Sequence, residues 1–205
     1  EPEASEEHKS ALESIEMLDV EENLKKYDSE SVMTENKGFI ARLVTVLAVC
    51  LSVYQLFLAS PWGTIPSAKA RAIHLGFVMA LIFLNVPMLK KKDGTLVNFI
   101  PWSLICAVLA LGFNFYLYGR VDPIAANGGV LTDLDYLCCA VILVLVLLAG
   151  RRSLGWIMCV LPILFLAYAY FGASLPGILN HRGFSVARLL RQMVTSAEGI
   201  YGIPL

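Results

Sequence analysis

The sequence predicts an all-α integral membrane protein with about five transmembrane helices, a short cytosolic N-terminal tail and a C-terminal amphipathic helix at the membrane interface. Hydrophobic residues make up 57% of the 205 residues and charged residues only 16%, whereas soluble domains carry about 25% charged residues. Five apolar runs are each close to the roughly 20 residues that a helix needs to cross the hydrocarbon core. None has an acidic residue at its centre. The runs are residues 39–60, 72–89, 96–118, 132–150 and 154–173.

The first segment, residues 1–37, is expected to be an acidic cytosolic tail. Its charge is offset by a basic remainder, so the formal net charge of −1 hides an uneven distribution. Ser10 and Glu13 fit a capping box, which predicts a short solvated helix. A helix lying against the membrane or a partner is the alternative. The first apolar run is longer than the roughly 7–15 apolar residues of a signal peptide, so we expect a retained helix.

The second segment, residues 38–150, is expected to hold the first four spans as one scaffold. Lys and Arg near span ends predict its orientation, because cytoplasmic loops carry an excess of them. The residues that would lie on one side of the membrane are Lys25, Lys26, Lys37, Arg42, Lys90, Lys91, Lys92, Arg151 and Arg152. Those that would lie on the other side are Lys69, Arg71 and Arg120. The excess places the N-terminus in the cytoplasm. Residues 119–130 then form an outer loop, in which Asp122-Pro123 and residues 127–129 are turn signals.

The remaining segments are a linking transmembrane helix, residues 151–183, and a surface helix within residues 184–205. Ser185 can cap that surface helix. Its apolar face is expected to hold Val186, Leu189, Leu190, Met193, Val194 and Ala197, and its polar face Arg188, Arg191, Gln192 and Thr195. This pattern is typical of a helix in the outer interface with its arginines near headgroups or water.

The sequence contains no recognisable catalytic constellation, so we predict that the chain is not an enzyme and holds no cofactor, metal or nucleic acid. The histidines, His8, His74 and His181, have neither a nucleophile partner nor metal-ligand spacing. We interpret His74 as a headgroup or loop contact. The five cysteines lie in apolar runs and are interpreted as small packing residues. They are Cys50, Cys106, Cys138, Cys139 and Cys159.

Polar residues inside the runs are few, and buried carboxylates that would mark an ion path are not expected. The amides of Gln55, Asn85 and Asn114 can bond across helices. Asp133 and Asp135 stand where they complement a helix N-terminus. Alternatively, these two belong to an outer polar surface that docks a soluble partner. The candidate docking residues are Arg120, Asp122, His181 and Arg182.

Several segments resemble the fused membrane subunits of tripartite ATP-independent periplasmic (TRAP) transporters. RAIHLGF at residues 71–77 resembles the start of their second span. FLAYAYFG at 165–172, LPG at 175–177 and HRGFS at 181–185 resemble the join between the four-span part and the twelve-span part. EGIYGIPL at 198–205 resembles the lead-in to the large part, and KYDSES at 26–31 is similar to the family's tail.

The resemblance implies a bacterial inner-membrane permease that imports organic acids, driven by a sodium gradient instead of ATP. Its partners would be membrane lipids, a periplasmic substrate-binding protein of the TAXI class, and a large transport part on a separate subunit or on the same chain. The four-span part would be the scaffold of an elevator-like symport cycle. Sodium and substrate would bind the large part, which in family fusions continues past Leu205, so no residue here is assigned to either.

A different class of function stays open beside this one. A self-contained five-span structural protein, such as an assembly factor or a lipid-binding anchor, also fits the spans. An intramembrane enzyme would need a nucleophile–base pair or a metal cluster within the spans, and the sequence offers neither.

Overall fold

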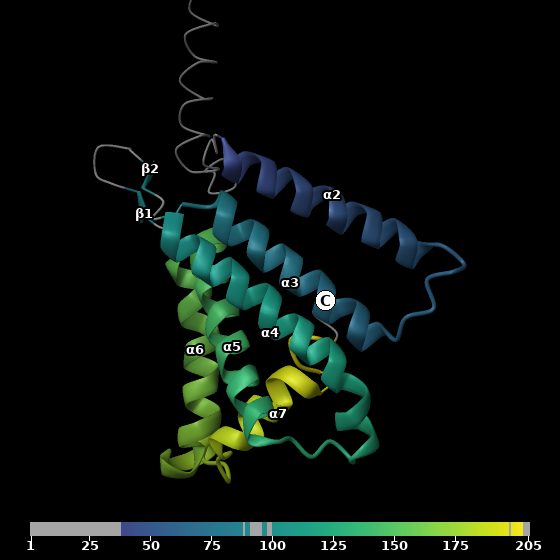
Figure 1. Cartoon of the computed structure of the whole chain (residues 1–205). Helices are drawn as coiled ribbons and strands as arrows, with labels where there is room; N and C mark the ends of the chain where they lie inside the picture. Colours follow the sequence, from purple (N-terminus) through teal and green to yellow (C-terminus); the bar gives the residue numbers. More distant parts are fainter. Residues whose placement is uncertain (1–37, 88, 91–95, 98–99, 197, 203–205) are drawn as a thin grey trace, which may run out of the picture. The chain divides into compact units, whose positions relative to one another are not determined.

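The computed structural model describes residues 38–205 apart from residues 88, 91–95, 98–99, 197 and 203–205. The helices are α2 (Phe39–Ala59), α3 (Ser67–Asn85), α4 (Ile100–Ala126), α5 (Asp133–Leu154), α6 (Trp156–Phe171) and α7 (Val186–Thr195). The 3₁₀ turns η2 (Gly172–Ser174) and η3 (Gly177–Leu179) separate α6 from α7 (Figure 1). The helices α2 to α5, and α6 together with η2, are long and apolar enough to cross a membrane, so the prediction of a five-span helical membrane protein is confirmed at this level. The expected tail, with its capping box and His8, lies outside the described residues.

Two helices differ in extent from their apolar runs. Helix α3 begins at Ser67 and not at Ala72, because its first turn is made of small and basic residues that hydropathy does not register. Helix α4 continues to Ala126, through most of the expected outer loop. Pro123 lies inside it, and the Pro123 carbonyl accepts a hydrogen bond from the Asn127 backbone N–H at 3.1 Å. The expected turn at Asp122-Pro123 is therefore wrong.

The turn after α4 is confined to residues 127–129. Gly128 and Gly129 adopt φ values of +63° and +78°, which side chains with a Cβ rarely adopt. The Gly129 N–H returns to the Ile124 carbonyl at 2.8 Å and closes the end of the helix. This part of the turn prediction is confirmed.

A short antiparallel pairing connects α3 to α4, which the all-α prediction did not include. Strand β1 (Leu89–Lys90) pairs with β2 (Leu96–Val97), with Leu89 opposite Val97 and Lys90 opposite Leu96. The ends of two apolar runs thus belong to a connection. Helix α3 stops at Asn85, before Pro87, so this proline does not interrupt it.

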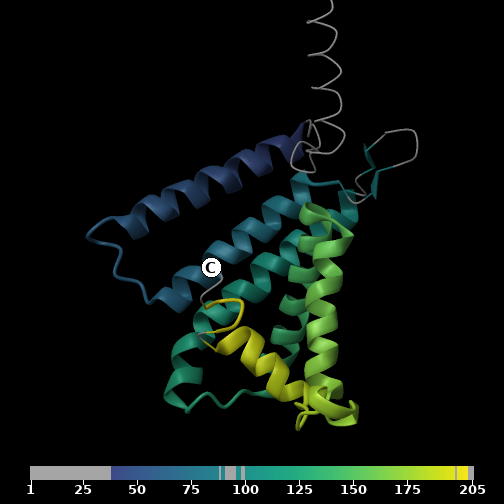
Figure 2. The ribbon, with the colours of Figure 1, turned by 180° about the vertical axis from the view of Figure 1, so that it is seen from behind.

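Three inner helices, α3, α4 and α5, form the core. Figures 1 and 2 show α3 and α4 running side by side, with α2 on the far side of α3 from α4. Small residues allow the inner backbones to approach closely, as in other membrane bundles. Those that are buried include Gly76, Ala80, Ala107 and Ala110. By contrast, α2 buries no residue and α6 buries only Cys159.

The end of α5 is tied to both other inner helices by Arg152. Its Nη1 donates to the Phe83 carbonyl and to the Ser103 hydroxyl, each at 3.0 Å, and the guanidinium lies 5.0 Å from the Phe83 ring centre. Phe83 lies in the last turn of α3, where unpaired carbonyls favour a cation. Arg152 therefore points into the protein, while its neighbour Arg151 stacks on Trp156.

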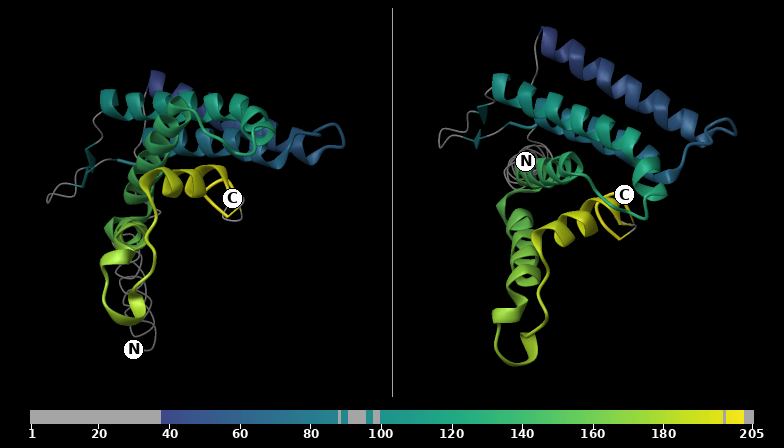
Figure 3. Two further views of the ribbon diagram at one scale, coloured as in Figure 1. Left: turned by 90° about the horizontal axis from the view of Figure 1, so that it is seen from below. Right: turned by 60° about the horizontal axis from the view of Figure 1, so that its bottom comes forward.

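The C-terminal helix begins as the sequence predicts. The Ser185 hydroxyl accepts a hydrogen bond from the Arg188 N–H at 3.4 Å. Val194 is 2% exposed and belongs to a cluster with side chains of α4 and α5, against which Leu190 and Met193 also pack. Figure 3 shows α7 alongside α5. Neighbouring helices therefore cover most of the apolar face of α7, although Val186 remains exposed.

The five cysteines are all free thiols. Four are buried, in keeping with packing roles, but Cys50 is exposed on α2. The packing role predicted for Cys50 is wrong, because Cys50 lies off the partly buried face of α2, on which Leu43, Val44 and Leu47 pack against the inner helices.

Candidate functional site

A buried carboxylate, Asp135, lies in the first turn of α5 and is 1% exposed. The guanidinium of Arg120 on α4 binds this carboxylate in a bidentate manner. Nε donates to Oδ1 at 2.9 Å, and Nη2 donates to Oδ2 at 2.8 Å. The Tyr116 hydroxyl donates to Oδ1 at 2.9 Å. The Thr132 N–H and hydroxyl donate to Oδ2 at 2.9 and 2.8 Å. Five donors therefore satisfy this carboxylate and fix α5 to α4.

This arrangement changes one expectation and confirms another. The spans were expected to lack buried carboxylates, yet Asp135 is one, placed at a helix end and fully paired. The helix N-terminal role expected for it is confirmed by its bonds to Thr132. The sequence held a signal for its partners, since Tyr116 and Arg120 are four residues apart and share one helix face.

A second ion pair joins α3 to α4 nearby. Lys69 Nζ bonds Asp122 Oδ2, and the ammonium lies 5.4 Å from the centre of the Tyr118 ring. The Asp122 side chain is 66% exposed, in contrast to Asp135. This pair therefore lies at the surface.

The segment between α6 and α7 holds the other two candidate docking residues. His181 Nδ1 accepts a hydrogen bond from the Gly183 N–H at 3.0 Å, so Nε2 carries the proton that it shares with the Tyr168 carbonyl at 3.1 Å. Both ring nitrogens are thus used to fold the segment against the end of α6. The backbone of Gly172 lies against this ring, where a Cβ would meet it at 1.9 Å. Arg182 beside it is exposed.

The four candidate docking residues thus fall into two pairs. Arg120 and Asp122 lie near the end of α4, and His181 and Arg182 lie between η3 and α7. Within the described part of the chain, no hydrogen bond or ion pair joins the two pairs. Arg120, Asp122 and His181 are engaged within the chain, which leaves Arg182 as the most available of the four.

The C-terminal segment is bound to α3 by Arg71, a contact that the sequence analysis missed. Arg71 Nη1 donates to the Tyr201 carbonyl at 3.0 Å and to the Gly202 carbonyl at 2.7 Å. Tyr201 is 7% exposed. Burial raises the pKa of its phenol from the ordinary value of 10.0, so the group stays a neutral hydrogen-bond donor. Because 130 residues separate Arg71 from Tyr201, spacing along the chain could not reveal the contact.

The same tyrosine reaches the α3–α4 interface. Its hydroxyl donates to Asn114 Oδ1, and Asn114 Nδ2 donates to the Ala110 carbonyl at 2.7 Å. Asn114 is 1% exposed and lies against Gly76. A Cβ added at Gly76 would lie 2.9 Å from the Cβ of Asn114. The amide was expected to bond across helices, and it bonds to the C-terminal segment instead.

A polar contact also joins α2 to α3. Gln55 Nε2 on α2 bonds His74 Nδ1 on α3. The interhelical role predicted for Gln55 is confirmed. The headgroup or loop contact predicted for His74 is wrong, because α2 lies beside this part of α3.

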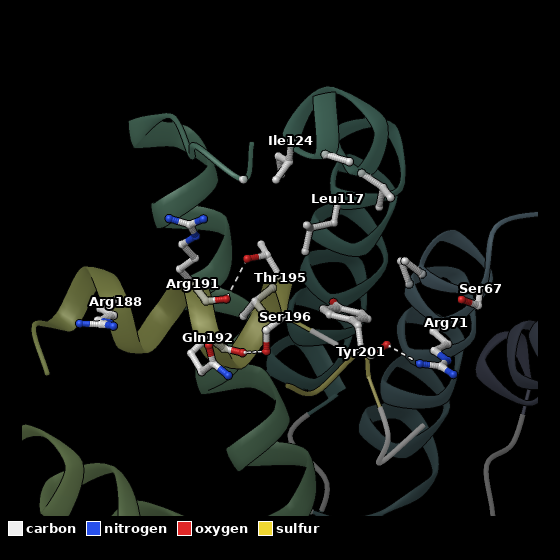
Figure 4. A pocket seen from close by; sticks show the side chains of 16 residues that line it. Ser67, Arg71, Leu117, Ile124, Arg188, Arg191, Gln192, Thr195, Ser196 and Tyr201 are labelled. Carbon is white, nitrogen blue, oxygen red and sulfur yellow. Dashed lines mark hydrogen bonds between the residues drawn. The ribbon is translucent and has the colours of Figure 1, made fainter. Parts of the chain in front are cut away.

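A cavity of about 680 Å³ opens between α3, α4, α7 and the C-terminal segment. Figure 4 shows Arg188 and Arg191 on α7 and Arg71 across from them on α3. Apolar side chains of α4, including Leu117 and Ile124, form the wall between them. The cavity therefore joins cationic and apolar surface.

The described residues include no group of three or more His, Cys, Asp or Glu side chains that could hold a metal ion. Comparisons of the chain with protein-family models, curated proteins and solved structures each found no match.

Proposed function

We propose that this chain is the scaffold part of a secondary-active, cation-coupled importer of organic acids of the TRAP type, which works with a periplasmic substrate-binding protein. Sodium is the proposed coupling ion, and it and the substrate would bind a separate transport domain. The scaffold would stay fixed in the membrane while that domain moves. The proposal begins with the resemblance of residues 71–77, 165–185 and 198–205 to the fused family members.

The single observation that carries the proposal is the bond between Arg71 and the carbonyls of Tyr201 and Gly202. Residues 71–77 and 198–205 carry two of the resemblances, and here they contact each other. If the four-span part must keep a fixed position relative to the segment after the linking helix, a direct contact such as that of Arg71 with this segment is required. The contact supports a scaffold that holds the start of a transport domain at a fixed place.

The use of polar groups supports the same assignment. Asp135, Asn114, Gln55 and Arg152 all bond other groups of the chain. Polar side chains that carry ions through a membrane must exchange partners during transport. Polar groups that already bond other groups of the chain are better suited to a structural scaffold than to an ion pathway.

The proposed location is the bacterial inner membrane, with the N-terminal tail in the cytoplasm and α7 near the periplasmic interface. Lys90 in the α3–α4 connection and Arg151 at the end of α5 support this orientation. Labelling of single cysteines in a cysteine-free chain tests it. A cysteine at position 90 should react only from the cytoplasmic side and one at position 127 only from the periplasmic side. The opposite result would overturn the orientation.

The function is tested by docking of the substrate-binding protein from the same organism to the chain in nanodiscs with its transport domain. Arg182→Glu should weaken binding at low salt, because exposed charges act mainly through long-range attraction. Arg151→Glu, on the opposite side, is the matched control and should bind like the wild type. Equal affinity for Arg182→Glu and wild type would remove the docking role of Arg182. Absence of any binding by the wild type would remove the importer assignment.

The second candidate function is a stand-alone five-span structural or assembly protein. The observation in its favour is that Asp135, Asn114, Gln55 and Arg152 bond other groups of this same chain. Proteoliposomes that contain only this chain should take up no organic acid under either proposal. Binding of the substrate-binding protein distinguishes the two.

A further inference from the structure

The cavity between α3, α4 and α7 is lined by three arginines that form no ion pair with a carboxylate of the described residues. The ion pairs among the described residues are Lys69–Asp122 and Arg120–Asp135, and neither includes Arg71, Arg188 or Arg191. Glu198 lies outside the cavity lining and accepts a hydrogen bond from Gln192. The residues that line the cavity include these three arginines and no Asp or Glu, so the lining carries a net positive charge.

Much of the hydrogen-bonding capacity of these arginines is left unused within the described chain. Arg71 bonds two carbonyls through Nη1 alone. Arg191 bonds the Gly128 carbonyl through Nη2 at a long 3.3 Å, and Arg188 stacks on the Phe184 ring at 5.3 Å. A guanidinium has five N–H donors and binds phosphate or carboxylate oxygens in pairs. Several donors therefore remain for an anion.

The position of the cavity favours a particular kind of anion. Its walls come from the first turns of α3, Ser67 to Ala72, and from the last turns of α4, Leu117 to Ala125. Both are end turns of membrane-length helices, and the ends of spanning helices are where lipid headgroups are expected. Leu117, Ile124 and Val194 give it an apolar wall beside the arginines. Basic pockets between spanning helices are suited to the headgroups of anionic lipids.

We propose that this cavity binds a phosphate-bearing molecule of net negative charge, with Arg188 and Arg191 on its phosphate. The apolar wall favours an anionic phospholipid as the source over a soluble phosphate ester. The site depends on the membrane location of the chain and not on the transport function. A bound lipid would join α7 to the inner helices and stabilise the C-terminal segment.

The test uses the full chain, purified in detergent and stripped of lipid, with dioleoylphosphatidylglycerol (DOPG) as the probe. Native mass spectrometry should detect one retained DOPG and much less dioleoylphosphatidylcholine (DOPC), which has no net charge. Arg188→Gln/Arg191→Gln should lower the affinity for DOPG about tenfold or more, because both basic residues at the phosphate are lost. Arg182→Gln is the matched control on the same segment outside the cavity and should retain DOPG.

The outcomes separate the possible sources of the anion. Displacement of DOPG by glycerol 3-phosphate at equal concentration would keep the anion site and assign it to a soluble phosphate ester. Equal retention of DOPG by wild type and Arg188→Gln/Arg191→Gln would overturn the site, as would equal retention of DOPG and DOPC by the wild type. Arg188→Gln alone replaces the double variant if the latter unfolds, and it should still weaken DOPG binding several-fold.

Discussion

Helices α2 and α3 have similar lengths and lie beside each other, yet they relate to the rest of the chain in opposite ways. Helix α2 is the more hydrophobic of the two and buries none of its residues, whereas a third of the α3 span is buried. Helix α3 has Gly76 and Ala80 where it meets α4, and Arg71 where it meets the C-terminal segment.

The contrast shows what holds helices together in lipid. Apolar side chains gain little by leaving lipid for protein, because the two environments are similar. Close backbone approach and satisfied polar groups therefore decide which helix is inner and which is outer. Substitutions at inner contacts should therefore lower stability more than matched substitutions at outer positions.

The largest effect is expected at the buried ion pair. Asp135→Asn puts an amide NH2 against groups that now donate to the buried carboxylate, and it should lower the free energy of unfolding by about 3 kcal/mol or more. Asp122→Asn breaks the exposed pair with Lys69 and should cost about 1 kcal/mol or less. Both are measured by denaturant titration in mixed micelles. Equal losses for the two variants would mean that burial does not distinguish the pairs.

Phe83→Ala on α3 and Phe57→Ala on α2 compare the two helices directly. Phe83 is fully buried and Phe57 is 44% exposed. Removing the Phe83 ring leaves a cavity and should lower the free energy of unfolding by about 3 kcal/mol. This value is near the lower end for buried aromatic residues, because in the unfolded state the helices separate and the ring of Phe83 lies in lipid and not in water. Phe57→Ala should change stability by less than about 0.5 kcal/mol. A similar loss at both positions, measured in the same micelle titration, would remove the distinction between inner and outer helices.

Some of the fold could be predicted because the membrane imposes it. The five helices follow from apolar runs of spanning length, and Ser185 and Asp135 were assigned to helix starts from local pattern alone. The extent of α3 and α4 could not be predicted in this way. Small residues such as Ala68, and a proline such as Pro123, are compatible with both helix and loop, and packing decides between them.

The candidate site was harder to predict for a related reason. Arg120, Asp122 and His181 were chosen because they are polar and near span ends, but such residues can face water or one another. Only the fold shows that Asp135 engages Arg120. Tyr201 carried no local signal at all, since its partner Asn114 is 87 residues away.

Gly76→Ala tests close approach at the α3–α4 interface. The new Cβ would stand 2.9 Å from the Asn114 Cβ, so the helices must separate, and we expect a loss of about 1–3 kcal/mol. Gly112→Ala on α4 is the matched control, because nothing lies within 4 Å of its Cβ position. It should be neutral or stabilise the chain by up to about 1 kcal/mol through higher helix propensity. A neutral Gly76→Ala in thermal melts would contradict the interface.

The smallest expected effect concerns the link between the inner helices and the C-terminal segment. Tyr201→Phe removes the hydroxyl that donates to Asn114 and leaves a buried acceptor unpaired, which should cost about 1–2 kcal/mol. Arg71 still binds the backbone carbonyl at position 201, so the segment should stay attached but open more often. Limited proteolysis after residue 195 should therefore quicken in Tyr201→Phe and not in Tyr170→Phe, whose side chain is 48% exposed. If both variants are cleaved at the wild-type rate, the hydrogen bond from Tyr201 to Asn114 does not hold the segment in place, and Arg71 together with apolar packing is sufficient.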